Sequence, residues 1–243
     1  MSTHKWVAIH QPNFFPWLGY FDKIARSDLF VFLDDVQYQK TGGTWSNRVK
    51  LLINSEGRWV TAPIDRSYHG TRTINEITFS EKEEWRWKIL KTIQAAYRRA
   101  PHFSEVWEVI EPLVCNPVET LAEFNVHAIT GLTAAIGLDT SRFVRSSCIP
   151  TGSVATQRLI ELTRSVGGDS YLCGGGSSGY QEDLAFADAG LNLLYQGFSP
   201  VPYQQQGAKD FVPGLSIIDA AMNVGWSGVM GLLAAGKADL CTP

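Results

Sequence analysis

The stretch WVAIHQPNFFPWLGYFDKIARSDLFVFL, residues Trp6–Leu33, contains two short apolar segments with an amphipathic segment between them. Trp6–His10 predicts a buried strand, which stops at Pro12 because proline cannot continue a ladder of backbone hydrogen bonds. Pro16–Arg26 places its apolar residues at helical spacing, with proline in the first turn. Leu29–Leu33 is continuously apolar, as expected of a strand in a sheet covered on both faces. The stretch therefore predicts a β-α-β unit.

The remaining chain divides into a hairpin, a helical middle part and a second region in which strands and helices alternate. Short apolar strands that alternate with helices predict a parallel sheet with right-handed crossovers. We predict a single α/β domain, residues 1–243, with a mostly parallel, Rossmann-like sheet, flanking helices and a mainly helical insertion around residues 80–138. The expected elements are a hairpin from Ser46–Ile53 and Arg58–Ile64, strands in Thr73–Phe79, Arg142–Arg145, Ser170–Cys173 and Leu191–Tyr195, and helices in Ser80–Arg99, Ser104–Val114, Val118–Ile136, Ser153–Val166, Tyr180–Ala189, Leu215–Met222 and Gly228–Ala235.

Composition excludes several classes of protein. With 44% hydrophobic and 19% charged residues, the 243-residue chain can bury a core and is neither disordered nor fibrous. A net charge of -3 gives no basic stripe, so we expect no nucleic-acid partner. A secretory signal and a membrane-spanning run are both missing from the pattern, which favours a cytoplasmic protein. The four cysteines lack C-x-x-C and metal-ligand spacing, so we expect reduced thiols and no metal site.

Polar residues follow the first predicted strand at the edge of a parallel sheet where ligands bind. His10 ends that strand, and Gln11 and Asn13 come directly after it. A histidine in this place is a candidate general base or phosphate ligand, and the alternative is a hydrogen-bonded residue that closes a turn. The two amide side chains beside it suit recognition of a small polar ligand.

Two later strands end on carboxylates and on glycines. Asp34 and Asp35 are adjacent, so at most one of them faces a given ligand, and a solvated turn is the alternative. Cys173 precedes Gly174–Gly176, where glycines permit positive φ and the following helix N-terminus favours an anion. A flexible turn is the alternative here, since the run matches neither a Walker A sequence nor a strict G-x-G-x-x-G.

Two further polar stretches are candidates for substrate binding. The segment Trp45–Lys50 places Arg48 and Lys50 on one face of a strand, where they suit a phosphate or a carboxylate. Tyr203 and Gln205 belong to a polar run without regular structure. A solvated surface is the alternative for both stretches.

These motifs, taken in order along the chain, resemble the WbqC-like protein family. The opening motif His10–Ile24 is the most specific part of the resemblance, which covers nearly the whole sequence. Cys173 stands where family members usually carry serine, and Ala220-Ala221-Met222 replaces a bulkier apolar run. Both departures suggest a specialised member. The other matching segments are Phe30–Gln37, Trp45–Arg48, Ala100–Phe103, Tyr171–Tyr180, Tyr203–Gln205 and Leu215–Asp219 through Asn223–Gly225.

The resemblance implies a transferase that forms an amide, for example by moving a glycyl group onto an amino sugar in polysaccharide, O-antigen or natural-product biosynthesis. In this hypothesis His10 is the general base, Asp34 or Asp35 orients it or the amine, and the amides of Gly174–Gly176 bind the oxyanion. Cys173 would accept the acyl group from a thioester donor, and a buried, unreactive thiol is the alternative. The expected substrate-binding residues are Gln11, Asn13, Trp17, Tyr20, Trp45, Asn47, Arg48, Lys50, Gly174, Gly175, Gly176, Ser177, Tyr180, Tyr203 and Gln205.

Other functions and partners stay open at this point. The order of a first strand, a proline-containing loop, a helix that opens with Leu18–Tyr20 and a second strand is similar to that of H-x-G-H nucleotidylyltransferases, although both histidines of that signature are missing. A nucleotide-dependent ligase or nucleotidylyltransferase would hold phosphates with basic residues and magnesium with Asp35. A non-catalytic sugar- or carrier-binding protein would use Trp17 and Trp45 as platforms. We expect a small-molecule substrate and an acyl or peptidyl carrier protein as partners, and we assign no cofactor. The basic residues of the nucleotide hypothesis are Arg48, Lys50, Arg145 and Arg158.

Overall fold

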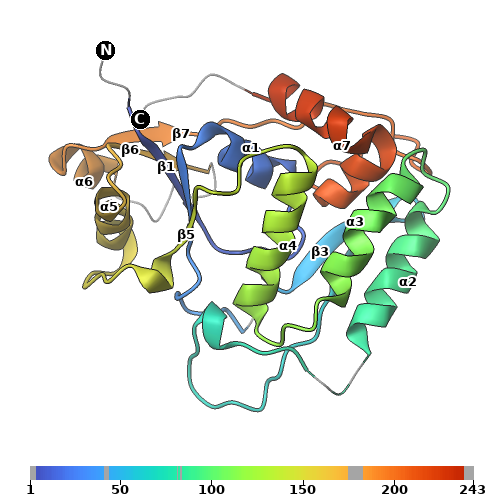
Figure 1. Cartoon of the computed structure of the whole chain (residues 1–243), viewed down its shortest axis with the longest axis horizontal. Coiled ribbons are helices and arrows are strands. Elements are labelled where there is room, and N and C mark those ends of the chain that lie inside the picture. The colour runs from blue at the N-terminus through green and yellow to red at the C-terminus, as the bar shows by residue number, and fades with distance from the viewer. Residues whose placement is uncertain (1–3, 41–43, 81, 83, 175–182, 238–243) are drawn as a thin grey trace.

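A five-stranded parallel sheet forms the centre of the molecule (Figure 1). The computed structural model describes residues 4–40, 44–80, 82, 84–174 and 183–237. The strands lie in the order β5-β2-β1-β6-β7, so β1 is central and its two neighbours extend the sheet in opposite directions. The predicted α/β fold with a mostly parallel sheet is therefore confirmed. The strands are β1 (Trp6–His10), β2 (Leu29–Phe32), β5 (Phe143–Arg145), β6 (Ser170–Cys173) and β7 (Asn192–Tyr195).

Helices cover both faces of this sheet, which explains the apolar character of its strands. Alternate side chains point to opposite faces, so Ala8 packs on one side while Val7 and Ile9 pack on the other. In Figure 1, α1, α4 and α7 lie on one side of the sheet, and α5 and α6 lie on the other. These helices are α1 (Leu18–Arg26), α4 (Leu121–Ala135), α5 (Ala155–Ser165), α6 (Asp183–Asp188) and α7 (Ile217–Ala235).

The segment between β2 and β5 contains an antiparallel hairpin followed by three helices. The predicted hairpin and the helical insertion are both present in it. The expected strand in Thr73–Phe79 was wrong, because the Thr73 and Glu76 side chains close a 3₁₀ turn there through a reciprocal capping box. The elements are β3 (Arg48–Ile53), β4 (Glu56–Thr61), the 3₁₀ turn η1 (Ile74–Glu76), α2 (Trp85–Tyr97), α3 (Phe103–Cys115) and α4.

The chain's last described helix, α7, consists of two segments that meet at Gly225. Gly225 has φ 72° and ψ 168°, a conformation that glycine adopts readily, and α3 packs so closely there that a Cβ would lie 2.7 Å from Glu105. The helix is long and apolar enough to cross a membrane. In the fold its first half, Ile217–Met222, is buried, which accounts for the apolar composition without a membrane.

Candidate active site

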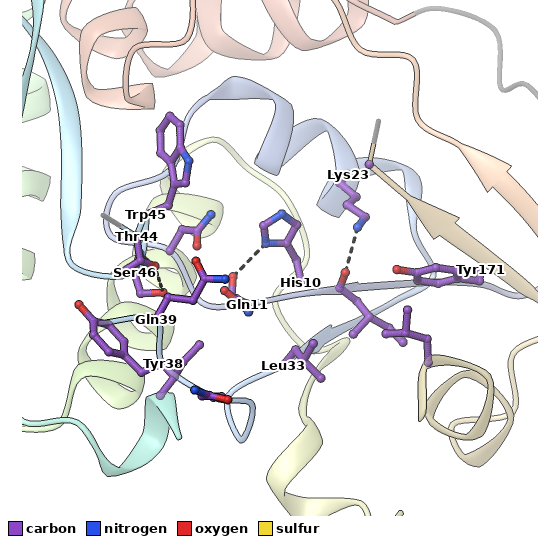
Figure 2. A pocket seen from close by; sticks show the side chains of 16 residues that line it. His10, Gln11, Lys23, Leu33, Tyr38, Gln39, Thr44, Trp45, Ser46 and Tyr171 are labelled. Atoms are coloured by element: carbon purple, nitrogen blue, oxygen red, sulfur yellow. Dashed lines mark hydrogen bonds between the residues drawn. The ribbon is translucent and has the colours of Figure 1, made fainter. Parts of the chain in front are cut away.

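A cavity of about 410 Å³ opens where β1 and β6 separate at their carboxyl ends (Figure 2). β1 is followed by α1 on one face of the sheet and β6 is followed by α6 on the other, so a crevice lies between the two strand ends. Such a switch point is the usual ligand site of open α/β sheets. The cavity is lined by Ile9 and His10 of β1, Gln11 and Asn13 after it, Lys23 of α1, Tyr171 and Gly174 of the β6 segment, and Gln37, Tyr38, Gln39, Thr44, Trp45 and Ser46, with Leu33, Ile74 and Leu159.

His10 faces this cavity as a neutral imidazole. Its Nδ1 lies 3.0 Å from the Gln11 carbonyl oxygen, which can only accept, so Nδ1 carries the proton and Nε2 is the acceptor nitrogen. Burial, together with the nearby charge of Lys23, lowers the pKa of His10 to about 3. The Tyr20 hydroxyl donates to the same carbonyl at 3.1 Å, and its ring meets the imidazole edge-on. Tyr20 thus fixes the orientation of His10.

Lys23 is the charged cavity residue that the sequence analysis missed. Its side chain is 3% exposed, and Nζ donates to the Ile9 carbonyl oxygen at 2.9 Å. Burial lowers the pKa of Lys23 to about 8, although the nearby Cys173 opposes the shift. None of the described carboxylates forms an ion pair with this ammonium group. A buried cation without a carboxylate partner is costly for the fold, and active sites are where proteins commonly retain such a group.

The glycine run meets the cavity at its first glycine. Gly174 lines the cavity, whereas Cys173 is completely buried and packs with the apolar cluster on the α5 and α6 face of the sheet. The predicted role of Cys173 as an acyl acceptor would need a donor to reach this buried thiol. The other predicted residues of the run, Gly175, Gly176, Ser177 and Tyr180, lie outside the described residues.

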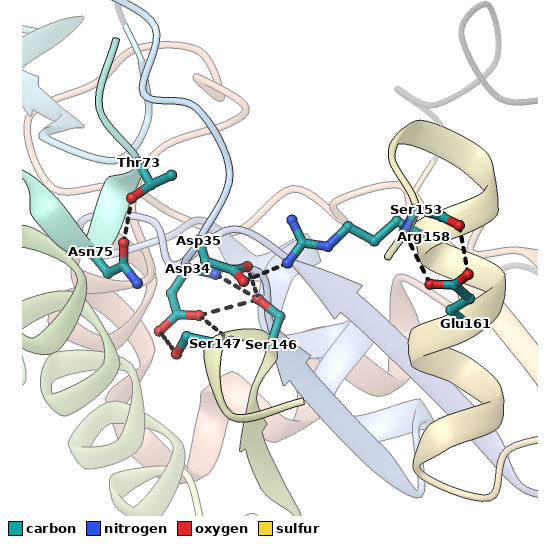
Figure 3. A network of polar contacts seen from close by, with 9 residues as sticks. All are labelled: Asp34, Asp35, Thr73, Asn75, Ser146, Ser147, Ser153, Arg158 and Glu161. Atoms are coloured by element: carbon teal, nitrogen blue, oxygen red, sulfur yellow. Dashed lines mark hydrogen bonds and ion pairs between the residues drawn. The ribbon is translucent and has the colours of Figure 1, made fainter. Parts of the chain in front are cut away.

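Asp34 and Asp35 lie at the same edge of the sheet but take no part in the cavity lining (Figure 3). Asp34 accepts hydrogen bonds from Ser147 N at 3.0 Å and from Ser147 Oγ at 2.8 Å. Asp35 accepts from Ser146 Oγ and forms an ion pair with Arg158, both at 2.5 Å. The two carboxylates thus connect the end of β2 to the 3₁₀ turn η2 (Ser146–Cys148) and to α5.

The basic residues predicted to hold phosphates are dispersed. Arg158 pairs with Asp35, and Arg145 lies 3.7 Å from Glu123. Arg48 and Lys50 do share one face of β3, as predicted, but neither lines the cavity. These four cations therefore do not converge on one phosphate.

The remaining predicted residues fall into three groups. Gln11, Asn13 and Trp45 line the cavity, with Trp45 at one end, Lys23 toward the other and His10 between them (Figure 2). Asn47 supports the lining from behind, because it accepts a hydrogen bond from the Tyr38 hydroxyl at 3.0 Å.

The last group lies elsewhere in the core. Trp17 packs against Phe198 at the start of α1. Tyr203 and Gln205 donate to the buried carboxylate of Asp219 at 2.6 and 2.8 Å. Burial raises the pKa of Asp219, and these hydrogen bonds oppose the shift. Tyr203 and Gln205 therefore satisfy a buried carboxylate under α7 and do not line the cavity.

Comparison with known proteins agrees with the resemblance of the motifs. A family model described as WbqC-like protein family matches residues 11–230. The chain belongs to the WbqC-like protein family. The WbqC-like chain is also 28% identical over 222 residues to "Uncharacterized protein Rv1507c" of Mycobacterium tuberculosis (strain ATCC 25618 / H37Rv), which covers 91% of this chain and 94% of the relative. No solved structure matches this chain.

The region matched by the WbqC-like family contains most of the cavity. Lys23, Trp45, Tyr171 and Gly174 all fall inside residues 11–230, while Ile9 and His10 lie just before its start. The family match thus includes most of the residues that line the cavity, and the chemistry of the cavity depends on their side chains.

Proposed function

We propose that this WbqC-like protein transfers an acyl or aminoacyl group to an amine and so forms an amide. One observation carries the proposal: a neutral histidine, His10, and a buried cation, Lys23, line the same cavity at the switch point of the sheet. Amide formation needs a proton acceptor for the attacking nitrogen and a positive group for the developing oxyanion. The family resemblance favours an amino sugar as the acceptor in polysaccharide or natural-product biosynthesis.

The reaction assigns a separate part to each of these side chains. The amine nitrogen attacks the acyl carbon, and the carbonyl electrons move to oxygen, where the Lys23 ammonium stabilises the negative charge. Nε2 of His10 takes the proton from the nitrogen. The oxyanion then collapses, the bond to the leaving group breaks, and the proton passes from His10 to that leaving group.

The pKa values of both groups suit these parts. With a pKa lowered to about 3, His10 is a weak base that is neutral at physiological pH. A weak base takes a proton readily only from an acidic group, and the nitrogen becomes acidic once it carries a positive charge in the tetrahedral adduct. With a pKa of about 8, Lys23 is mostly protonated at pH 7, and its buried position strengthens its interaction with an oxyanion.

Product formation tests the proposal directly. The protein is incubated with glucosamine and either a glycyl thioester of N-acetylcysteamine or glycine with ATP, and the amide is detected by mass spectrometry. We expect an amide with one of these donors, and a turnover about 10²–10⁴-fold lower in His10→Ala. An amide formed at the same rate by His10→Ala would contradict the proposed mechanism, and absence of any amide would contradict the reaction class.

The strand order supports a second candidate, a nucleotide-dependent ligase. Parallel sheets that reverse their order at a central strand commonly bind nucleotides at that point, and β1 is such a strand here. A ligase would activate the acid with ATP before the same amide-forming step. Release of AMP or ADP that requires both glycine and the amine favours the ligase, and amide formation from a thioester without ATP favours the transferase.

A further inference from the structure

We propose that the mouth of the cavity binds a nucleoside diphosphate group, with its base stacked on tryptophan and its phosphates beside arginine and lysine. The inference adds a substrate class to the proposed function and rests on it only in placing the reacting group at His10. The surface that would bind this group, called the rim below, consists of Lys40, Trp45, Arg48, Trp59, Arg66 and Tyr68.

The rim belongs to a strongly cationic part of an acidic chain. Residues 37–72 carry six lysines and arginines against two carboxylates, a net charge of +4, whereas the whole chain carries -3. Among the described residues, Lys40, Arg48 and Arg66 form no ion pair with any carboxylate. Their charges are therefore available to an anionic ligand.

Exposed aromatic rings lie among these cations. Trp45 is 39% exposed and Trp59 is 40% exposed, and their rings meet edge to face with centroids 4.6 Å apart. The Arg48 guanidinium lies 4.1 Å from the centroid of Trp59. Exposed tryptophan on a folded surface loses hydrophobic stabilisation, so a pair of such rings beside a cavity favours a planar ligand that covers them.

Two buried polar atoms of the rim lack hydrogen-bond partners among the described residues. They are Nε of Arg48 and the hydroxyl of Tyr68. The Lys40 ammonium lies 3.9 Å from the centroid of the Tyr68 ring and donates to the Tyr68 carbonyl oxygen, so a cation stands beside this ring. Buried polar groups in native proteins are nearly always satisfied, and groups without a partner indicate a missing ligand or water.

The rim is continuous with the cavity that contains His10. Trp45 lines the cavity and contacts Trp59, which carries Arg48 on its face. Tyr38 lines the cavity as well, and burial raises its pKa to about 12 while the charges of Arg66 and Arg48 oppose the shift. The positive charge of the rim therefore reaches the cavity wall.

A nucleoside diphosphate fits these observations better than other anions. A free phosphate or a phosphorylated lipid headgroup would need the cations but not the tryptophan pair. A nucleic-acid strand would need a longer basic track, and residues outside 37–72 carry a net charge of -7. A base and two phosphates match one aromatic platform and a few neighbouring cations.

Calorimetric binding measurements test the inference. The probes are ADP, UDP, GDP and CDP, with inorganic pyrophosphate, the matching nucleoside and a short single-stranded RNA as comparisons. We expect at least one diphosphate to bind at least about tenfold more tightly than pyrophosphate or the nucleoside, because a stacked base and the phosphates both contribute. Trp45→Ala and Arg48→Gln should each weaken that binding about tenfold.

Matched controls separate the rim from general effects. Trp87→Ala removes the more exposed tryptophan of α2, which does not line the cavity, and Arg58→Gln removes a cation that pairs with Glu56 on the opposite face of the hairpin. Both controls should bind the diphosphate like the unchanged protein. His10→Ala should bind it equally well, so loss of turnover in that variant bears on the proposed function alone.

Three results would overturn the inference. These are tight binding of pyrophosphate that Trp45→Ala leaves unchanged, binding of the RNA without binding of any free diphosphate, and no binding of any probe. If Trp45→Ala loses diphosphate binding, the rim assignment stands even when no amide product is found. If amide forms from a non-nucleotide donor and acceptor while no diphosphate binds, the rim assignment fails and the proposed function stands.

Discussion

The carboxyl edge of the sheet contains two polar regions that differ in how their charged groups are satisfied. At the ends of β2 and β5, Asp34 and Asp35 are bonded to serine and arginine side chains (Figure 3). At the ends of β1 and β6, His10 and Lys23 line a cavity, and their side-chain hydrogen bonds to described residues go to backbone carbonyls (Figure 2). In the proposed function the first region supports the fold, whereas the second supplies the reacting groups.

The course of the chain explains the difference. After β5 the chain turns at once into η2, whose Ser146 and Ser147 reach the neighbouring carboxylates of the β2 end. The helices that follow β1 and β6 lie on opposite faces of the sheet, and the described residues leave a cavity between the two strand ends. A position at the end of a strand is thus not sufficient for a functional role, and the switch point decides which strand ends remain open.

The largest expected effect is at the ends of β1 and β6, called the open region below, where His10 and Lys23 line the cavity. We expect His10→Ala to lower turnover about 10²–10⁴-fold, because the proton acceptor of the reaction is removed. The free energy of unfolding should change little, since among the described residues the His10 side chain is hydrogen-bonded to the adjacent Gln11 carbonyl, which retains the Tyr20 hydroxyl as a donor. Chemical denaturation and turnover are measured on the same preparation. A lower free energy of unfolding with unchanged turnover would show that His10 supports the fold, and the two polar regions would then not differ in function.

The ends of β2 and β5, called the closed region below, should show the opposite result, a loss of stability without a loss of turnover. We expect Asp34→Ala to lower the free energy of unfolding by about 2–4 kcal/mol, because the backbone N–H and the hydroxyl of Ser147 lose a buried carboxylate acceptor. Turnover per folded molecule should stay near that of the unchanged protein. Ser147→Ala, which removes one donor and keeps the carboxylate, is the matched control and should cost less. Loss of turnover in well-folded Asp34→Ala would place this carboxylate in the reaction.

The pH dependence of turnover sharpens the assignment further. The proposed reaction needs neutral His10, whose pKa is lowered to about 3, and protonated Lys23, whose pKa is lowered to about 8. We therefore expect kcat/KM to be flat at neutral pH and to fall as pH rises through about 8, where the ammonium is lost. Because the folded pKa of Lys23 lies below its usual 10.5, the unfolded chain binds more protons between these values, and stability should rise with pH there. If kcat/KM of Lys23→Met still falls as pH rises through about 8, another group causes that fall.

The smallest effect is expected for Cys173. Because its side chain is completely buried and does not line the cavity, Cys173→Ser should retain turnover and cost about 1 kcal/mol of stability through the hydroxyl placed among apolar residues. Intact-protein mass spectrometry with the thioester donor should show no acyl adduct on either variant. An adduct on the unchanged protein that Cys173→Ser abolishes would restore the predicted nucleophile.

The sequence predicts much of the fold because its central signals are local. The apolar runs of β1 and β2 and the helical spacing of α1 are complete within Trp6–Leu33. The expected strand at Thr73–Phe79 fails because the side chain of Glu76 bonds back to the backbone N–H of Thr73, and this contact outweighs a weak alternation. Local propensity decides an element only where no specific side-chain contact competes with it.

The site was predicted less completely because its polar contacts are distant in sequence. Asp34 and Asp35 were placed in it by the rule for strand ends, and nothing near them in sequence reveals Ser146, more than a hundred residues later. Lys23 resembled an ordinary solvated lysine. A usable signal did exist, because Lys23 lies three residues after Tyr20 and next to Ile24 on the apolar stripe of α1. A charged residue within such a stripe merits attention as a site residue.

Thermal unfolding and turnover of Lys23→Met, measured on one sample, test the functional assignment of the open region most directly. Methionine keeps the volume and removes a buried charge that has no carboxylate partner among the described residues, so the melting temperature should stay equal or rise. Turnover should fall about 10²–10³-fold, because the oxyanion loses its cation. Lower turnover with an equal or higher melting temperature is the result that the account predicts. Unchanged turnover with a lowered melting temperature would show that Lys23 supports the fold, and would contradict the account.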